Sequence, residues 1–256
     1  MMKATIVQCG LKWEDKSANL AHISSLLDEA APGSGMVVLP EMFTTGFTMN
    51  PAPLAESMDG PTVKWMKERS SAGGYALCGS VIIGEEGMFY NRMIFVTPSG
   101  QVAFYDKRHL HSMSGEQTVY SRGNKRVVVS YGEFSFNLQV CYDLRFPVWS
   151  RNRGDTDVLI YSSNWPSVRI SVWKALLVAR AIENQCYVIG ANRVGESPDG
   201  TTYTGDSAII GPRGEMLASM EPNAEGVVSA MLSMESLEKY RTDMPIWRDA
   251  DPFELI

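Results

Sequence analysis

The sequence has few cysteines, and none is placed in a way that suggests a disulfide framework or a metal site. The 256 residues contain only Cys9, Cys78, Cys141 and Cys186, with no CxxC pair and no cluster of cysteine and histidine. Disulfide-stapled domains and zinc sites both need closely arranged cysteines or ligands. Because Cys9, Cys78 and Cys186 each lie in an apolar run, we expect them to be small core residues.

The chain also lacks a long hydrophobic run and an excess of positive charge. No apolar stretch approaches the length of a membrane span, and the first residues show neither the apolar core nor the cleavage site of a signal peptide. Lys and Arg number 23 against 29 Asp and Glu, which gives a net charge of −6. This balance argues against nucleic acid or an anionic membrane as the main partner. These absences together predict a reduced, soluble, cytoplasmic protein.

What the sequence does contain is an alternation of short apolar runs with amphipathic segments. Runs bounded by Gly, Pro or Asn, many of them rich in Val and Ile, predict strands at 4–9, 36–39, 75–83, 91–96, 127–129, 134–140, 158–161, 186–191, 207–210 and 226–232. Helical periodicity and a Gly60-Pro61 start predict helices over 16–31, 62–72 and 172–184. The two halves share a β-α-β-α-β-β-β order, which predicts sheets with helices on their outer faces. No Gly/Ser linker divides the chain, so we expect one domain over residues 1–256.

Cys141 differs from the other cysteines because it ends a strand-like run. Phe134–Val140 leads into the polar segment Cys141–Pro147, which resembles the start of a helix. Backbone N–H groups and the positive end of a helix dipole at such a place favour a thiolate, the reactive form of cysteine. Cys141 is therefore a candidate nucleophile.

Two further strand ends carry charged side chains. Glu41 follows the run Val37–Leu39 and precedes an aromatic residue, and a carboxylate in such apolar surroundings has a raised pKa that suits a general base or acid. Lys107 follows the run Val102–Tyr105 and supplies a fixed positive charge against a developing oxyanion. Each residue taken alone also fits an ordinary charged side chain at a turn.

A thiol, a carboxylate and an ammonium form a complete set for acyl transfer. The thiol attacks a carbonyl or nitrile carbon, and water then cleaves the acyl-enzyme. His22, His109 and His111 all precede the candidate nucleophile, and none has the surroundings of a papain-like histidine. We therefore expect a carboxylate to be the base.

Three segments resemble the signature segments of the carbon–nitrogen hydrolase (nitrilase) superfamily. They are Leu39–Phe43, Tyr105–Leu110 and Val140–Pro147. Lys107 follows Glu41 by 66 residues and precedes Cys141 by 34, which is the order and spacing typical of the family. The resemblance spans nearly the whole chain. It implies an α/β fold, a four-layer αββα sandwich of two packed mixed sheets flanked by helices. It also implies Glu41 as general base, Lys107 as stabiliser of the tetrahedral intermediate and Cys141 as nucleophile.

The same resemblance implies roles for further residues. Glu116, between the Lys and Cys segments, matches the family's second active-site glutamate and would position Lys107 or the substrate. The backbone N–H of Tyr142 would be a second oxyanion donor. Asp143 and Arg145 would brace the turn by ion pairing. No metal or organic cofactor is implied.

Within the superfamily the chain is most similar to the omega-amidases, which hydrolyse the terminal amide of 2-oxoglutaramate and 2-oxosuccinamate. The cue is the segment Cys141–Phe146, which differs from the Cys-Trp-Glu pattern of true nitrilases. An N-carbamoyl amino acid or polyamine-precursor amidohydrolase stays open as an alternative with the same chemistry and a different pocket. A binding or scaffold protein on this fold is the non-enzymatic alternative.

The substrate pocket and the partners are predicted from individual residues. Phe43, Phe47 and Trp165 are candidates for the walls of a small pocket, and Arg145 or Arg169 would supply the cation that a substrate carboxylate needs. The C-terminal stretch 240–249 combines aromatic residues, proline and charge without helical periodicity. Because family members commonly use such a tail in dimer contacts, the resemblance implies a homodimer that binds a small amide.

Overall fold

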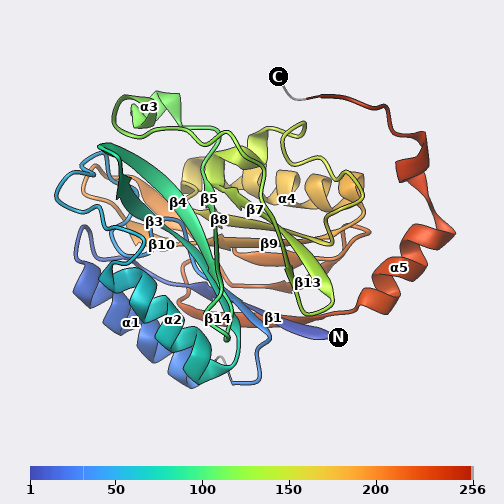
Figure 1. Ribbon diagram of the computed structural model, residues 1–256, viewed down its shortest axis with the longest axis horizontal. Coiled ribbons are helices and arrows are strands. Elements are labelled where there is room, and N and C mark those ends of the chain that lie inside the picture. The colour runs from blue at the N-terminus through green and yellow to red at the C-terminus, as the bar shows by residue number, and fades with distance from the viewer. Residues whose placement is uncertain (31, 255–256) are drawn as a thin grey trace.

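The computed structural model describes residues 1–30 and 32–254, and its centre is a pair of six-stranded mixed sheets (Figure 1). The first sheet has the strand order β14-β1-β2-β3-β4-β5. Its strands are β1 (Met2–Gln8), β2 (Met36–Val38), β3 (Ala76–Glu85), β4 (Met88–Val96), β5 (Val102–Asp106) and β14 (Gly226–Leu232). β1, β2 and β3 run parallel, while β14, β4 and β5 are antiparallel to their neighbours.

The second sheet repeats this arrangement with the order β13-β12-β9-β8-β7-β6. Its strands are β6 (Val128–Tyr131), β7 (Phe134–Val140), β8 (Val158–Ser163), β9 (Tyr187–Asn192), β12 (Ala208–Ile210) and β13 (Met216–Ser219). Again three central strands, β7, β8 and β9, are parallel and the flanking strands are antiparallel. The similarity of the two halves that the sequence predicted is therefore present in the sheet topology.

Helices cover the outer face of each sheet and complete four layers. α1 (Lys16–Ala30) and α2 (Pro61–Gly73) lie side by side on the first sheet, and α4 (Ile170–Asn184) lies on the second (Figure 1). α2 begins at Gly60-Pro61, where the missing proline N–H has no intrahelical partner to lose, and ends at Gly74 with a φ of 68°. The predicted αββα sandwich is confirmed.

The core explains why the central strands are rich in apolar residues. Ile6 and Val38 of the first sheet share one buried cluster with Leu138 and Ile160 of the second, so one face of each sheet packs against the other sheet. The alternate residues, such as Val37, instead face α1 and α2. A strand buried on both faces has no polar side to present to water.

Several shorter elements were not predicted from the sequence. They are α3 (Glu116–Val119), α5 (Met234–Asp243), the hairpin of β10 (Val194–Glu196) with β11 (Thr202–Thr204), the strand β13 and the 3₁₀ turns η1 (Ser112–Ser114), η2 (Cys141–Arg145), η3 (Ser167–Arg169) and η4 (Ile246–Asp249). Two expectations were wrong here. The residues after Cys141 form one 3₁₀ turn instead of a helix, and the C-terminal stretch contains helix. α5 forms because Ser233 caps it, with its Oγ accepting from the N–H of Ser236 at 3.2 Å, and because Leu237 is buried.

Among the described residues, no helix is long and apolar enough to cross a membrane. All four cysteines are free, and only Cys141 is partly exposed. Cys9, Cys78 and Cys186 are buried in the clusters that pack the sheets, as the sequence predicted. The cytoplasmic location and the single-domain organisation stay predictions.

Candidate active site

The ends of three strands bring the predicted charged and nucleophilic residues together. Glu41 lies three residues beyond β2 and Lys107 directly follows β5, both in the first sheet. Cys141 directly follows β7 in the second sheet, and Glu116 is the first residue of α3. The site therefore lies where the two sheets meet, and each sheet supplies a part of it.

Glu41 is held by donors from both sheets. Its side chain is fully buried, and its Oε1 accepts from Lys107 Nζ at 2.8 Å and from Asn91 Nδ2 at 2.7 Å. Its Oε2 accepts from the backbone N–H of Asn164 at 2.8 Å, and its carbonyl accepts from Asn164 Nδ2 at 2.7 Å. Asn164 directly follows β8, so these bonds fasten the Glu41 turn to the second sheet.

Lys107 lies between two buried carboxylates. Besides its bond to Glu41, Nζ lies 3.0 Å from each carboxylate oxygen of Glu116. Burial alone would lower the pKa of Lys107, but Glu116 and Glu41 outweigh burial and raise that pKa above its ordinary value. Burial raises the pKa of Glu116, which Lys107 opposes and Glu41 reinforces. Lys107 is therefore a fixed cation, and the two carboxylates compete for it.

Cys141 has a strained backbone and a thiol whose pKa is raised. Its φ of 44° lies in the left-handed region, which costs a side-chain-bearing residue of order 1 kcal/mol. Burial and then the negative Glu41 raise the thiol pKa well above its usual value, and the opposing effect of Lys107 is smaller. Burial and Glu41 thus act on the thiol pKa against the direction expected from a helix start, and one 3₁₀ turn supplies little dipole to oppose them.

Asp143 braces the turn at Cys141, but not through an ion pair with Arg145. Asp143 Oδ2 accepts from the backbone N–H of Val140 at 3.0 Å and from the hydroxyl of Tyr105 at 2.8 Å. Its Oδ1 accepts from the backbone N–H of His109 at 3.0 Å and lies 2.7 Å from His109 Nδ1. The predicted Asp143–Arg145 brace was wrong, because the guanidinium of Arg145 lies over the Trp165 ring at 5.0 Å.

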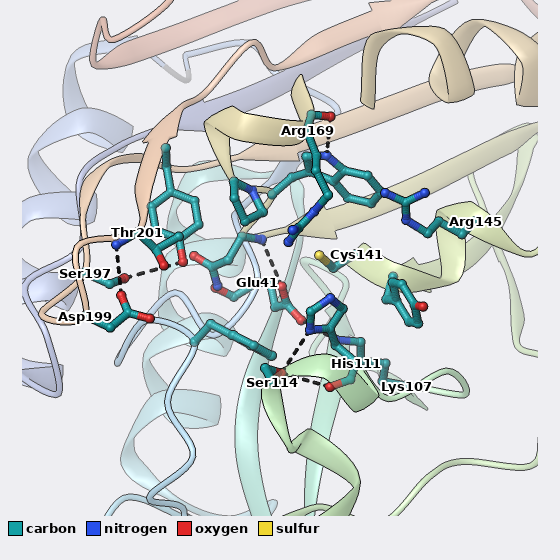
Figure 2. Close-up of a pocket in the computed structure, with 16 residues that line it drawn as sticks. Glu41, Lys107, His111, Ser114, Cys141, Arg145, Arg169, Ser197, Asp199 and Thr201 are labelled. Atoms are coloured by element: carbon teal, nitrogen blue, oxygen red, sulfur yellow. Dashed lines mark hydrogen bonds and ion pairs between the residues drawn. The ribbon is translucent and has the colours of Figure 1, made fainter. Parts of the chain in front are cut away.

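A cavity of about 150 Å³ opens beside these residues (Figure 2). Of the predicted residues, it is lined by Glu41, Phe47, Lys107, Cys141, Tyr142, Arg145, Trp165 and Arg169. In Figure 2 the side chain of Arg169 reaches toward Cys141. Phe43 is the exception, because it is fully buried against Trp65 in the core beneath α2, with ring centroids 5.9 Å apart. The prediction of Phe43 as a pocket wall was wrong.

Other residues of the site were missed. His111 and Ser114 line the cavity, and its far wall is the β10–β11 hairpin, through Ser197, Asp199, Thr201 and Tyr203. Nothing in the sequence indicated the hairpin, whose strands of three residues carry no apolar run. Asn91 offered a signal, because a polar residue at the start of an apolar strand run needs a partner once buried. Among the described residues, no group of three or more His, Cys, Asp or Glu is arranged to hold a metal ion.

A thiol next to a carboxylate and an ammonium, at the strand ends of an αββα sandwich, is suited to opening carbon–nitrogen bonds through a thioester. Residues 3–242 match the carbon–nitrogen hydrolase family, and this chain belongs to that family. It is similar to the omega-amidase YafV of Escherichia coli, with 45% identity over 99% of this chain and 98% of the relative. It is also similar to the 2-oxoglutaramate amidase of Bacillus subtilis, with 32% identity over 97% of this chain and 98% of the relative.

The solved structures agree with this assignment. A CN-hydrolase superfamily protein from Xanthomonas campestris, with an arsenic adduct in its active site, is 40% identical and has a TM-score of 0.97 over 100% of this chain and 99% of that protein. Nit3 of Saccharomyces cerevisiae, a member of branch 10 of the nitrilase superfamily, is 25% identical with a TM-score of 0.85. It matches 96% of this chain and 94% of the yeast protein. The chain is thus a C–N hydrolase.

Proposed function

We propose that this enzyme is an omega-amidase that hydrolyses the terminal amide of 2-oxoglutaramate and 2-oxosuccinamate to the dicarboxylate and ammonia. Relatives that align over the full chain are an omega-amidase and a 2-oxoglutaramate amidase. The structural observation that carries the proposal is a pair of guanidinium groups, those of Arg145 and Arg169, beside the nucleophile.

These two arginines make the cavity suitable for an anionic substrate. Neither forms an ion pair with another side chain in the described ranges, and the Arg145 guanidinium lies over the Trp165 ring. Guanidinium groups bind carboxylates through paired, charge-assisted hydrogen bonds. A cationic polyamine precursor would meet repulsion in the same place, which disfavours that alternative.

The first half of the reaction transfers the acyl group to sulfur. Glu41 accepts the proton of Cys141 as Sγ bonds to the amide carbon, so the thiolate forms during attack and not before it. The carbonyl π electrons move to oxygen. This oxyanion accepts from the backbone N–H of Tyr142 and from the third N–H of Lys107, because one N–H points to Glu41 and a second is shared by the two oxygens of Glu116. The C–N bond then breaks, and nitrogen leaves with the proton as ammonia.

Glu41 is the better placed glutamate to carry that proton. Glu41 lines the cavity, whereas Glu116 does not. Both oxygens of Glu116 already accept from Lys107, and Oε2 also accepts from the backbone N–H of His111 at 2.5 Å. We therefore assign Glu116 to the positioning of Lys107 and Glu41 to proton transfer.

The second half releases the acid. A water molecule adds to the thioester carbon while Glu41 takes one of its protons, and a second tetrahedral oxyanion forms between the same donors. The C–S bond breaks, and the proton passes from Glu41 to sulfur. The enzyme returns to the neutral thiol that burial favours.

Ammonia release from a panel of amides tests the proposal. The panel is 2-oxoglutaramate, 2-oxosuccinamate, glutamine, asparagine and an N-carbamoyl amino acid. We expect turnover of the two oxo-acid amides by the wild type and by Cys186→Ala, a buried cysteine away from the site, and none by Cys141→Ala. Turnover of another amide alone would contradict the substrate. Activity that survives in Cys141→Ala would contradict the mechanism.

We also propose a homodimer that uses the C-terminal segment. α5 and the residues after it extend from one end of the sandwich (Figure 1), and Met244 and Trp247 are more than half exposed. Exposed apolar side chains gathered on one segment suit a protein interface. A monomeric mass by light scattering at micromolar concentration would contradict this.

A further inference from the structure

Asn91 lies at the centre of the buried charge cluster, although it does not line the cavity. It is fully buried on β4, where its carbonyl accepts from the backbone N–H of Lys107 at 3.0 Å. Its Nδ2 donates to Glu41 Oε1 at 2.7 Å and to Glu116 Oε1 at 3.2 Å. One residue thus contacts all three charged residues of the cluster.

The charges explain what this contact does. Two carboxylates, those of Glu41 and Glu116, share the single ammonium of Lys107, and none of the three is more than 1% exposed. Repulsion between two carboxylates is strong where water is excluded. An amide NH₂ has two partly positive hydrogens and no acceptor capacity on nitrogen, so it can give one hydrogen to each carboxylate.

The other end of the same side chain shows that the amide has one orientation. Asn91 Oδ1 is buried without a hydrogen-bond partner among the described residues. Turning the amide around would place this oxygen against both carboxylates, which is worse than leaving it unpaired. An unpaired buried acceptor destabilises a fold, so packing and stability alone do not account for an asparagine here. The need for a hydrogen-bond donor to both Glu41 and Glu116 does account for it.

We propose that Asn91 is a positioning residue for the hydrolysis, which keeps Glu41 aimed at Cys141 and separate from Glu116. This rests on the proposed role of Glu41 as the base for the thiol. The bonds to Asn91 and Lys107 fix Oε1 of Glu41, and the Asn164 N–H fixes Oε2. Without Asn91, Oε1 keeps only the ammonium for which Glu116 also competes.

Loss of the Asn91 donor should therefore affect kcat more than KM. The residue is outside the cavity, so the substrate loses no contact. The carboxylates, with one donor fewer, should take up a proton at higher pH. The acid limb of the kcat/KM profile should then move to higher pH, which a purely structural residue would not cause.

Two variants and a matched control test this. Asn91→Leu removes the donor at similar size, and Asn91→Asp keeps the shape but puts an acceptor in its place. Asn137→Leu removes another fully buried asparagine, on β7, which contacts Gln139 and Thr156 instead of the site. Each variant is checked for folding by circular dichroism. We measure kcat, KM and the pH profile, and the rate at which iodoacetamide alkylates Cys141, which needs no amide substrate.

For both Asn91 variants we expect kcat to fall about 10- to 100-fold, as for the loss of a hydrogen bond to a charged group, with KM within about 3-fold. Alkylation should slow and its pH dependence should shift in the same direction. Asn137→Leu should keep the wild-type pH profile. A wild-type profile in the Asn91 variants, or a loss no larger than that of Asn137→Leu, would overturn the proposal. The alkylation result stands whichever amide proves to be the substrate.

Discussion

Glu41 Oε1 and Lys107 Nζ lie 2.8 Å apart, with neither side chain more than 1% exposed. A buried pair of this kind gains little net stability, because removing both charges from water offsets their attraction. What the pair provides is position, since one member is the proposed base and the other the proposed oxyanion donor. Both line the same cavity as Cys141 (Figure 2).

Removing Lys107 should be costly for stability and activity. Lys107→Met leaves Glu41 and Glu116 buried without a cation, which should lower the free energy of unfolding by about 3–5 kcal/mol and abolish measurable turnover. The pKa of Glu116 is already raised in the folded protein, so the folded protein binds a proton on the Glu116 carboxylate more tightly than the unfolded chain does. The deficit should therefore shrink as pH falls through that folded pKa. Urea unfolding at about pH 5.5 and pH 8 measures it. Lys239→Met, in an exposed pair with Asp243, is the control, and an equal loss there would contradict the prediction.

The thiol of Cys141 should carry a proton throughout the neutral range. Its pKa is raised well above the usual value, and burial raises the pKa of Cys9 and Cys186 to about 12. The difference in thiolate absorbance at about 240 nm between wild type and Cys141→Ala should stay flat up to about pH 9. A thiolate signal that rises near pH 6 or 7 would show a preformed ion pair instead.

Arg169 should contribute more than Arg145 to substrate binding. The Arg169 side chain reaches toward Cys141, whereas Arg145 is engaged with the Trp165 ring (Figure 2). Arg169→Gln should raise KM for 2-oxoglutaramate about 10- to 100-fold, in line with a charge-assisted hydrogen bond, and should change kcat less. Arg213→Gln, an exposed arginine over Tyr240, is the control. An unchanged KM of the Arg169 variant in steady-state kinetics would show that Arg169 does not bind the substrate.

Phe43 and Phe47 should separate stability from binding. Phe43 is buried in the core beneath α2, so Phe43→Leu should lower the free energy of unfolding by about 1–2 kcal/mol with little change in KM. Phe47 lines the cavity, with Lys107 Nζ 5.0 Å from its ring centre, so Phe47→Leu should change KM or kcat more than stability. Chemical unfolding and steady-state kinetics of the two variants test these assignments. A loss of binding in Phe43→Leu with a loss of stability in Phe47→Leu would contradict them.

The central strands and the three main helices could be predicted because the spacing of apolar residues along each of them matches the face that is buried. β1, β2 and β3 carry buried apolar residues on both faces, since each packs against a sheet on one side and helices on the other. The short elements carry no such signal. α5 depends on a Ser233 cap and one buried side chain, Leu237, and the turn after Cys141 depends on bonds from Asp143 to residues more than 30 positions away.

The identities of the site residues were predictable, but their electrostatics were not. Glu41, Lys107 and Cys141 sit in local segments with a clear order, so sequence suffices to find them. Asn91 and Asn164 belong to the site only because two strands place them against Glu41. The raised pKa of the Cys141 thiol likewise follows from burial and from Glu41, which lies 100 residues earlier. A polar residue in an apolar run, such as Asn91, indicates that a partner is needed, but the local pattern does not show which distant residue that partner is.

The first sheet is closed by the strand that is synthesised last. β14 pairs along the whole of β1, from Met2 with Leu232 to Gln8 with Gly226. While the chain is still emerging from the ribosome, β1 is an open edge with unpaired backbone groups, and the Glu41 turn beyond its neighbour β2 has no finished sheet beneath it. Glu41 also needs the end of β8 to hold it. The sheet that carries Glu41 and Lys107 is therefore complete only when residues 226–232 have paired with β1.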